Sequence, residues 1–147
     1  MTQDEWKMID RADRLAAELH KDQRDKGDEP YIRHPRRVKM KLLAGEYPAP
    51  MICAGVLHDV VEDTSMTLEE LGQQFPARVV ELVDRLSRRP GETYLAFIQR
   101  IADDKEAAII KLADIDDNLD ATRPYPITPS LRDRYNRART ILRKVIE

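Results

Sequence analysis

Apolar residues recur at intervals of three and four along almost the whole chain, and strict alternation of apolar and polar residues is scarce. Near the start this apolar set is Trp6, Ile9, Ala12, Ala16 and Leu19. Such spacing places the apolar side chains on one face of a helix, whereas a half-buried strand requires alternation. Asn-Gly and Asp-Gly pairs, which favour tight hairpins, are absent from the sequence. We therefore expect an all-α protein.

The spacing also predicts where the helices lie. The expected helices cover residues 4–20, 35–45, 51–62, 67–75, 77–86, 92–103, 106–119 and 129 to near the end. Residues 21–32 are polar and contain a glycine and a proline, which predicts a loop. Thr67 and Glu70 have the spacing of a capping box, and residues 123–129 form a proline-rich connector. No repeat or long linker divides the chain, so we expect one domain over residues 1–147.

Composition argues against several classes of protein. Of the 147 residues, 41% are hydrophobic and 35% are charged, which is typical of a globular domain that can bury a core without disulfides. The net charge of -2 argues against a general nucleic-acid binder. Cys53 has no second cysteine to pair with, the first residues do not resemble a signal peptide, and no apolar run is long enough for a membrane span. We expect a cytoplasmic protein that binds neither nucleic acid nor a membrane.

Residues 57–64, LHDVVEDT, place one imidazole and three carboxylates in a segment that is otherwise apolar. On a continuous helix His58 and Glu62 would share a face, and so would Asp59 and Asp63. Burying several carboxylates without partners is costly, so a metal ion or basic side chains would have to offset their charge. The alternative is an exposed helix end with ordinary surface acids, which Glu62 and Asp63 taken alone would fit equally well.

Two other segments carry possible ligands for a metal ion. His34, in YIRHP, lies where the expected loop enters a helix, and a lone histidine there is usually structural. Asp114, in IIKLADIDDN, interrupts an apolar helix, with Asn118 one turn later. Lys111 could neutralise Asp114 without any metal ion. Taken singly, each of these residues is a weak indication of a metal site.

Taken together, the segments HKDQRDKGDEPYIRHP, LHDVVEDT, LVDRLSR and KLADIDDN resemble the HD-domain metal phosphohydrolases. The nearest branch is the hydrolase domain shared by the RelA/SpoT family and its small stand-alone (p)ppGpp hydrolases. The similarity runs from about residue 20 to residue 118, in the same order and spacing. It implies a compact helical HD-domain bundle. It also implies metal-dependent hydrolysis of the 3′-diphosphate of ppGpp or pppGpp, which yields GDP or GTP and pyrophosphate.

The resemblance further implies one divalent metal ion, usually manganese in this family. Its ligands would be His34, His58, Asp59 and Asp114. A mixed set of nitrogen and oxygen donors suits Mn²⁺ or a similar ion and does not resemble a structural zinc site.

Four more residues match functional positions of the family. Glu62 and Asp63 correspond to an acidic pair that members competent for hydrolysis keep. They would accept or relay a proton, or order the attacking water. Arg24 matches a basic residue near the nucleotide and would offset phosphate charge. Asn118 matches a residue that contacts the ribose.

The remaining positions of these motifs are interpreted structurally. His20 and Gln23 also match the family, and we interpret them as supports of the loop. Ile115, Asp116 and Asp117 depart from the family pattern, in which a basic residue follows KLAD. Two extra carboxylates would repel a polyanionic substrate, so we expect Asp116 and Asp117 to face solvent. This departure leaves the identity of the nucleotide open.

Two other functions are compatible with the same motifs. One is hydrolysis of another nucleotide or phosphorylated metabolite, and the other is a catalytically silent regulator that binds a nucleotide. The arginines of the last helix could attract an anionic nucleotide, but we interpret them as a solvated face. Tyr94 and Phe97 are interpreted as core residues. The expected partner is a small nucleotide, and the sequence does not indicate an oligomeric state.

Overall fold

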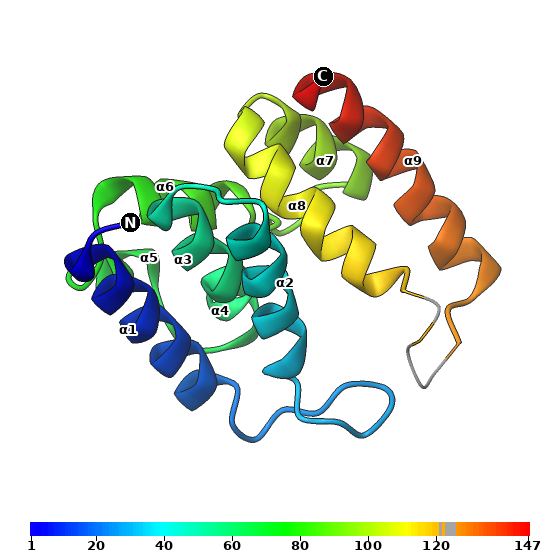
Figure 1. Ribbon diagram of the computed structural model, residues 1–147. Helices are drawn as coiled ribbons and strands as arrows, with labels where there is room; N and C mark the ends of the chain where they lie inside the picture. Colours follow the sequence, from blue (N-terminus) through cyan, green and yellow to red (C-terminus); the bar gives the residue numbers. More distant parts are fainter. Residues whose placement is uncertain (121, 123–125) are drawn as a thin grey trace.

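The computed structural model describes residues 1–120, 122 and 126–147, and this part of the chain is a bundle of helices without a strand (Figure 1). The helices are α1 (Gln3–Leu19), α2 (Arg33–Ala44), α3 (Ala49–Leu57), α4 (Val60–Asp63), α5 (Leu68–Gly72), α6 (Ala77–Arg85), α7 (Tyr94–Ala102), α8 (Lys105–Asn118) and α9 (Pro129–Ile146). The all-α prediction is confirmed. In the expected proline-rich connector, residues 123–125 lie outside the described part of the chain.

Side-chain caps fix where several helices begin. The hydroxyl of Thr67 accepts a hydrogen bond from the Glu70 amide at 3.1 Å, and the Glu70 carboxylate accepts one from the Thr67 amide at 3.2 Å. This is the capping box that the sequence predicts. Thr2 and Glu5 form a second capping box at the start of α1. These caps satisfy amides that have no partner within their helix.

Helix α3 is the centre of the bundle. It packs against α1, α2, α6 and α8, and eight of its nine residues are buried. A helix that is apolar on every side is stable only when neighbours cover every side. Helix α2 lies close to Gly55, because a Cβ atom at this position would lie 2.5 Å from Cδ1 of Leu42 and would force that side chain to move.

Helix α1 covers one side of α3 with a narrower apolar face than its sequence predicts. Ile9, Ala12 and Ala16 are buried against the core. Trp6, which belongs to the same apolar series, is 50% exposed. The expected inward position of Trp6 is therefore wrong, because the helix contributes only its central turns to the core.

Helices α7, α8 and α9 pack against one another, and Figure 1 shows α9 running along α8. Ala138 and Leu142 of α9 are buried, whereas most of its arginines are exposed, as expected for a solvated face. Phe97 lies in the core, as predicted. Tyr94 is only partly buried.

Candidate active site

The segment that carries His58 and Asp59 is not a continuous helix. Helix α3 ends just before His58 and α4 begins just after Asp59, so the expected single helix over residues 51–62 is wrong. Nδ1 of His58 lies 2.7 Å from the carbonyl oxygen of Gly55. In an unbroken helix this carbonyl would accept the amide of Asp59 instead. The break leaves both side chains at the junction of two helices, with 2% of His58 and 16% of Asp59 exposed.

Two other helices bring His34 and Asp114 to this junction. His34 lies in the first turn of α2 and Asp114 in the second half of α8. Nε2 of His34 lies 2.8 Å from Oδ1 of Asp114, and Nε2 of His58 lies 3.5 Å from the same oxygen. Nε2 of His58 also lies 3.1 Å from Oδ2 of Asp59. The structure therefore brings together the four side chains that the resemblance implies as metal ligands.

The chemistry of these groups fits a cation. One ligand atom each from His34, His58 and Asp59 lies within 4.8 Å of the other two. Because Nδ1 of His58 donates its proton to the Gly55 carbonyl, Nε2 carries the lone pair whenever the imidazole is neutral. This buried nitrogen has no hydrogen-bond partner among the described residues. A proton or a metal ion would stabilise a lone pair beside carboxylate oxygens, and imidazole with carboxylate is a donor set that divalent ions accept.

The carboxylates shift the pKa of both imidazoles upward. Burial lowers the pKa of His58, but the charges of Asp59 and Asp114 outweigh burial and raise this pKa well above its ordinary value. Burial likewise lowers the pKa of His34, and hydrogen bonds to Asp114 and Asp117 raise it to about 9. Burial raises the pKa of Asp59, yet His58 brings it down to about 2. The site thus favours positive charge at its centre, and protons and a metal ion compete for it.

Neighbouring side chains hold the two carboxylates in place. The hydroxyl of Tyr31 donates a hydrogen bond to Oδ2 of Asp59. Nζ of Lys111 lies 2.7 Å from Oδ2 of Asp114, and Nδ2 of Asn118 donates to Oδ1 of Asp114 at 3.3 Å. Lys111 thus contacts one oxygen of Asp114 and leaves the other, Oδ1, facing the imidazoles.

Asp117 is buried beside His34 and does not face solvent as expected. It is buried, with 1% of its surface exposed, and it contacts both Nδ1 of His34 at 2.7 Å and Nε of Arg37 at 2.8 Å. The expected solvent-facing position is wrong because these two partners offset its charge. Asp117 follows Asp114 by three residues on α8, so the two share a face of the helix, and this spacing could have predicted that Asp117 lies near the site. Asp116 is more exposed, but it pairs with Arg139 of α9 at 3.0 Å.

Glu62 and Asp63, the expected catalytic pair, lie at the end of α4 in different surroundings. The carboxylate of Glu62 accepts a hydrogen bond from the backbone amide of Arg88. Partial burial raises the pKa of Asp63, and the charges of Asp59 and Glu62 raise it further, to about 6. An acid that titrates near neutral pH is suited to proton transfer. Asp63 therefore fits the role of a general acid or base.

The loop between α1 and α2 is tied to this acidic segment. Nε2 of Gln23 donates a hydrogen bond to the backbone oxygen of Asp63 at 2.9 Å. Oε1 of Gln23 lies 2.9 Å from Nδ1 of His20, and the ring of His20 packs edge-on against Tyr31 with centroids 5.0 Å apart. These contacts agree with the supporting role expected for His20 and Gln23.

Arg24 and Asn118, the expected substrate-binding residues, line one cavity of about 300 Å³. Its other lining residues are Asp25, Lys26, Tyr31, Ile127, Leu131 and Tyr135. Because Tyr31 lines the cavity and also bonds to Asp59, the cavity adjoins the cluster of possible metal ligands. The volume lies at the lower end of the range for small-ligand sites.

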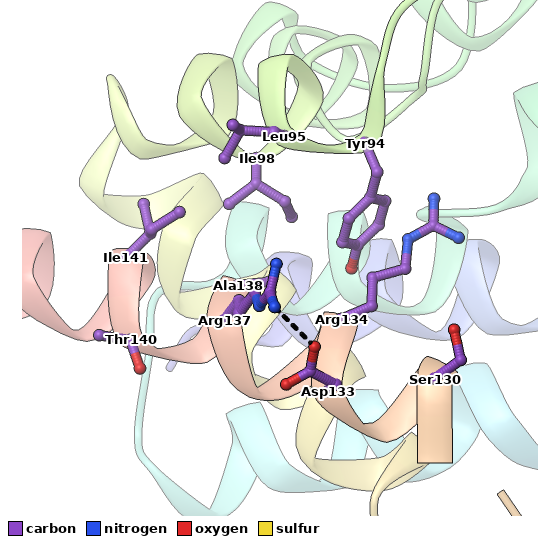
Figure 2. A pocket seen from close by; sticks show the side chains of 10 residues that line it. All are labelled: Tyr94, Leu95, Ile98, Ser130, Asp133, Arg134, Arg137, Ala138, Thr140 and Ile141. Carbon is purple, nitrogen blue, oxygen red and sulfur yellow. Dashed lines mark ion pairs between the residues drawn. The ribbon is translucent and has the colours of Figure 1, made fainter. Parts of the chain in front are cut away.

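A larger cavity, of about 600 Å³, lies between α7 and α9 (Figure 2). It is lined by Tyr94, Leu95, Ile98, Ser130, Asp133, Arg134, Arg137, Ala138, Thr140 and Ile141. Arg134 stacks on Tyr94 at 3.8 Å from the ring centroid, and Arg137 pairs with Asp133 at 3.0 Å. None of the expected site residues lines this cavity, so size alone does not identify the active site here.

Comparison with known proteins defines the class. A sequence model of the HD domain matches residues 12–108. This chain belongs to the HD-domain family, which confirms the resemblance on which the helical-bundle prediction was based. Among the residues that the structure describes, no helix is long and apolar enough to cross a membrane.

Within this class, the similar proteins have names that refer to guanosine phosphates. The guanosine-3′,5′-bis(diphosphate) 3′-pyrophosphohydrolase of Aquifex aeolicus is 36% identical over 119 residues, which cover 76% of this chain and 17% of that protein. The bifunctional (p)ppGpp synthase/hydrolase SpoT of Escherichia coli K12 is 30% identical over 130 residues, with 81% and 18% covered. A GTP pyrophosphokinase of Streptomyces coelicolor is 36% identical over 118 residues, with 74% and 14% covered.

A solved structure is similar over nearly the whole chain. It is described as a metazoan ortholog of SpoT that hydrolyzes ppGpp and plays a role in starvation responses. The two structures agree with a TM-score of 0.78 at 28% identity, covering 95% of this chain and 85% of the other. By contrast, the chain spans only 14 to 18% of the length of the three curated relatives named above.

Proposed function

We propose that this protein hydrolyses the 3′-diphosphate of ppGpp or pppGpp and releases GDP or GTP with pyrophosphate. The observation that carries the proposal is the convergence of His34, His58, Asp59 and Asp114 beside the cavity lined by Arg24 and Asn118. The names of the hydrolase relatives and of the solved structure support the substrate.

Hydrolysis is favoured over synthesis by the chain's own residues. A relative named as a pyrophosphokinase matches this chain as well as the hydrolases do, so names alone do not distinguish the two activities. Glu62 and Asp63 are both present, and the family resemblance associates this acidic pair with hydrolysis. The same pair argues against a silent nucleotide-binding regulator.

The resident ion in this proposal is one Mn²⁺, held by His34, His58, Asp59 and Asp114. A bound divalent ion lowers the pKa of water and offsets the negative charge that develops on a phosphate. Tyr31 holds Asp59 in orientation through its hydroxyl, so that the carboxylate keeps its position during turnover.

Side chains around the cavity would transfer the proton and bind the substrate. Asp63 takes the proton from the water that attacks the phosphorus, as its pKa of about 6 permits. Arg24 offsets part of the charge of the diphosphate, and Asn118 contacts the sugar from α8. Because the proposed substrates are intracellular nucleotides, we propose a cytoplasmic location.

The proposal is tested by incubating the purified protein with Mn²⁺ and ppGpp and separating the products by anion exchange. We expect pyrophosphate and GDP. Asp63→Asn should lower turnover by about 10²- to 10⁴-fold, the usual contribution of a general acid or base, while Mn²⁺ still binds. Asp116→Asn, a matched change at a more exposed site, should retain activity. Turnover of another nucleotide with ppGpp untouched would overturn the substrate, and binding without product would favour a silent regulator.

A further inference from the structure

Asp117 contacts His34 and Arg37 through different oxygens. Oδ2 lies 2.7 Å from Nδ1 of His34, and Oδ1 lies 2.8 Å from Nε of Arg37. The side chains of Asp117 and His34 are 2% and 10% exposed, so water does not substitute readily for either contact. Arg37 is 31% exposed and reaches Asp117 from α2, on the turn that follows His34.

The contact with Asp117 determines which nitrogen of His34 carries a proton. An ionised carboxylate only accepts hydrogen bonds, so Nδ1 must be the donor. In the neutral imidazole, Nε2 then carries the lone pair, and Nε2 is the nitrogen that lies 2.8 Å from Asp114 at the candidate metal centre. A second partner of this kind commonly sets the tautomer and the orientation of a metal-binding histidine.

We propose that Asp117 is a positioning residue that fixes His34 in the tautomer able to bind the metal ion, and that Arg37 fixes which oxygen Asp117 presents to His34. The inference rests on the metal centre of the proposed function and not on the identity of the substrate.

Asp117→Asn should place a hydrogen-bond donor opposite Nδ1 of His34. Arg37 can only donate, so it takes the single oxygen of the new amide. The amide nitrogen, a donor, then faces Nδ1 of His34 and favours the opposite tautomer, with the proton on Nε2 where the metal ion would bind. Adding Arg37→Met removes this donor from the amide oxygen. The amide can then turn its oxygen toward His34 and restore the productive tautomer.

The test is calorimetric titration of the metal-free protein with Mn²⁺ in the absence of nucleotide. We expect Asp117→Asn to weaken Mn²⁺ binding by about 10- to 100-fold, as is usual when a partner of a metal-binding histidine is changed. The double variant with Arg37→Met should bind more tightly than Asp117→Asn alone. Arg37→Met alone is measured to complete the cycle. Asp116→Asn, the neighbouring carboxylate that faces Arg139, should bind Mn²⁺ as the wild type does.

The results distinguish failure of the positioning role of Asp117 from failure of the proposed hydrolysis. A merely structural role would make the double variant worse than the single one, and that result would overturn the positioning role, as would wild-type affinity in Asp117→Asn. Thermal unfolding of the metal-free variants shows whether each is folded. The expected pattern of Mn²⁺ binding together with no hydrolysis of ppGpp would overturn the proposed function and leave this inference standing. A wild-type protein that binds no Mn²⁺ would overturn both.

Discussion

Replacing Lys111 by methionine should destabilise the metal-free protein strongly. Nζ of Lys111 lies 2.7 Å from Oδ2 of Asp114, and the two side chains are 13% and 7% exposed. Methionine keeps most of the volume and removes the charge, so Asp114 loses the ammonium group that contacts this oxygen. Removing one partner of a buried ion pair usually costs about 3–5 kcal/mol. That loss is a large share of the roughly 5–15 kcal/mol that stabilises a protein.

The assay is urea unfolding in the presence of EDTA and again with saturating Mn²⁺. With EDTA the urea midpoint of Lys111→Met should fall, and in a parallel thermal scan the melting temperature should drop by about 10 °C. With Mn²⁺ the difference from the wild type should shrink, because a divalent ion in direct contact with Asp114 then replaces the imidazole protons and offsets charge that Lys111 no longer offsets. Lys105→Met, at an exposed position at the start of the same helix, should change stability by less than about 0.5 kcal/mol.

Two results would refute this reasoning. Wild-type stability of Lys111→Met in EDTA would show that the pair does not offset a buried charge. A loss of stability that is equally large with EDTA and with Mn²⁺ would show that Asp114 is not a ligand of the metal ion.

Two further changes separate binding of the metal ion from binding of the substrate. Tyr31→Phe removes the hydrogen bond to Asp59, so the free energy of unfolding should fall by about 1.5–3 kcal/mol and Mn²⁺ binding should weaken by at least about 10-fold. Tyr47→Phe, for which the structure shows no hydroxyl partner among the described residues, is the control, and equal effects in both would contradict the role of Tyr31. Arg24→Ala should raise KM for ppGpp by about 10-fold with kcat nearly unchanged, because the lost contact is present in both ground and transition states. Arg143→Ala, an exposed arginine of α9, should leave KM unchanged, and an unaltered KM in Arg24→Ala would remove it from the binding site.

The helices were predictable because their causes are local. The spacing of apolar residues predicted most of the helices, and the Thr67 capping box formed as expected. The break at His58 was not predictable from spacing, because apolar residues continue past it at Val60 and Val61. A side chain makes the break by taking the carbonyl of Gly55, and such competition with the backbone does not alter a hydrophobic pattern.

The residues of the candidate site that belong to short motifs were predictable from the sequence. The position of Asp117, which depends on partners far away in the sequence, was not. His34, His58, Asp59 and Asp114 were assigned from motifs, and the structure brings them together. Asp117 was expected to face solvent because an extra carboxylate at the site would repel a polyanionic substrate. Its burial depends on His34 and Arg37, which lie 83 and 80 residues away in the sequence, and only the packing of α2 against α8 brings these groups together.

The destination of the oxygen atom of water tests the proposed hydrolysis most directly. The reaction is run with Mn²⁺ and ppGpp in ¹⁸O-labelled water, and both products are analysed by mass spectrometry. Attack on the phosphorus bonded to the ribose 3′-oxygen should place one labelled oxygen in pyrophosphate and none in GDP. Label in GDP, release of orthophosphate in place of pyrophosphate, or no product at all would contradict the proposed reaction.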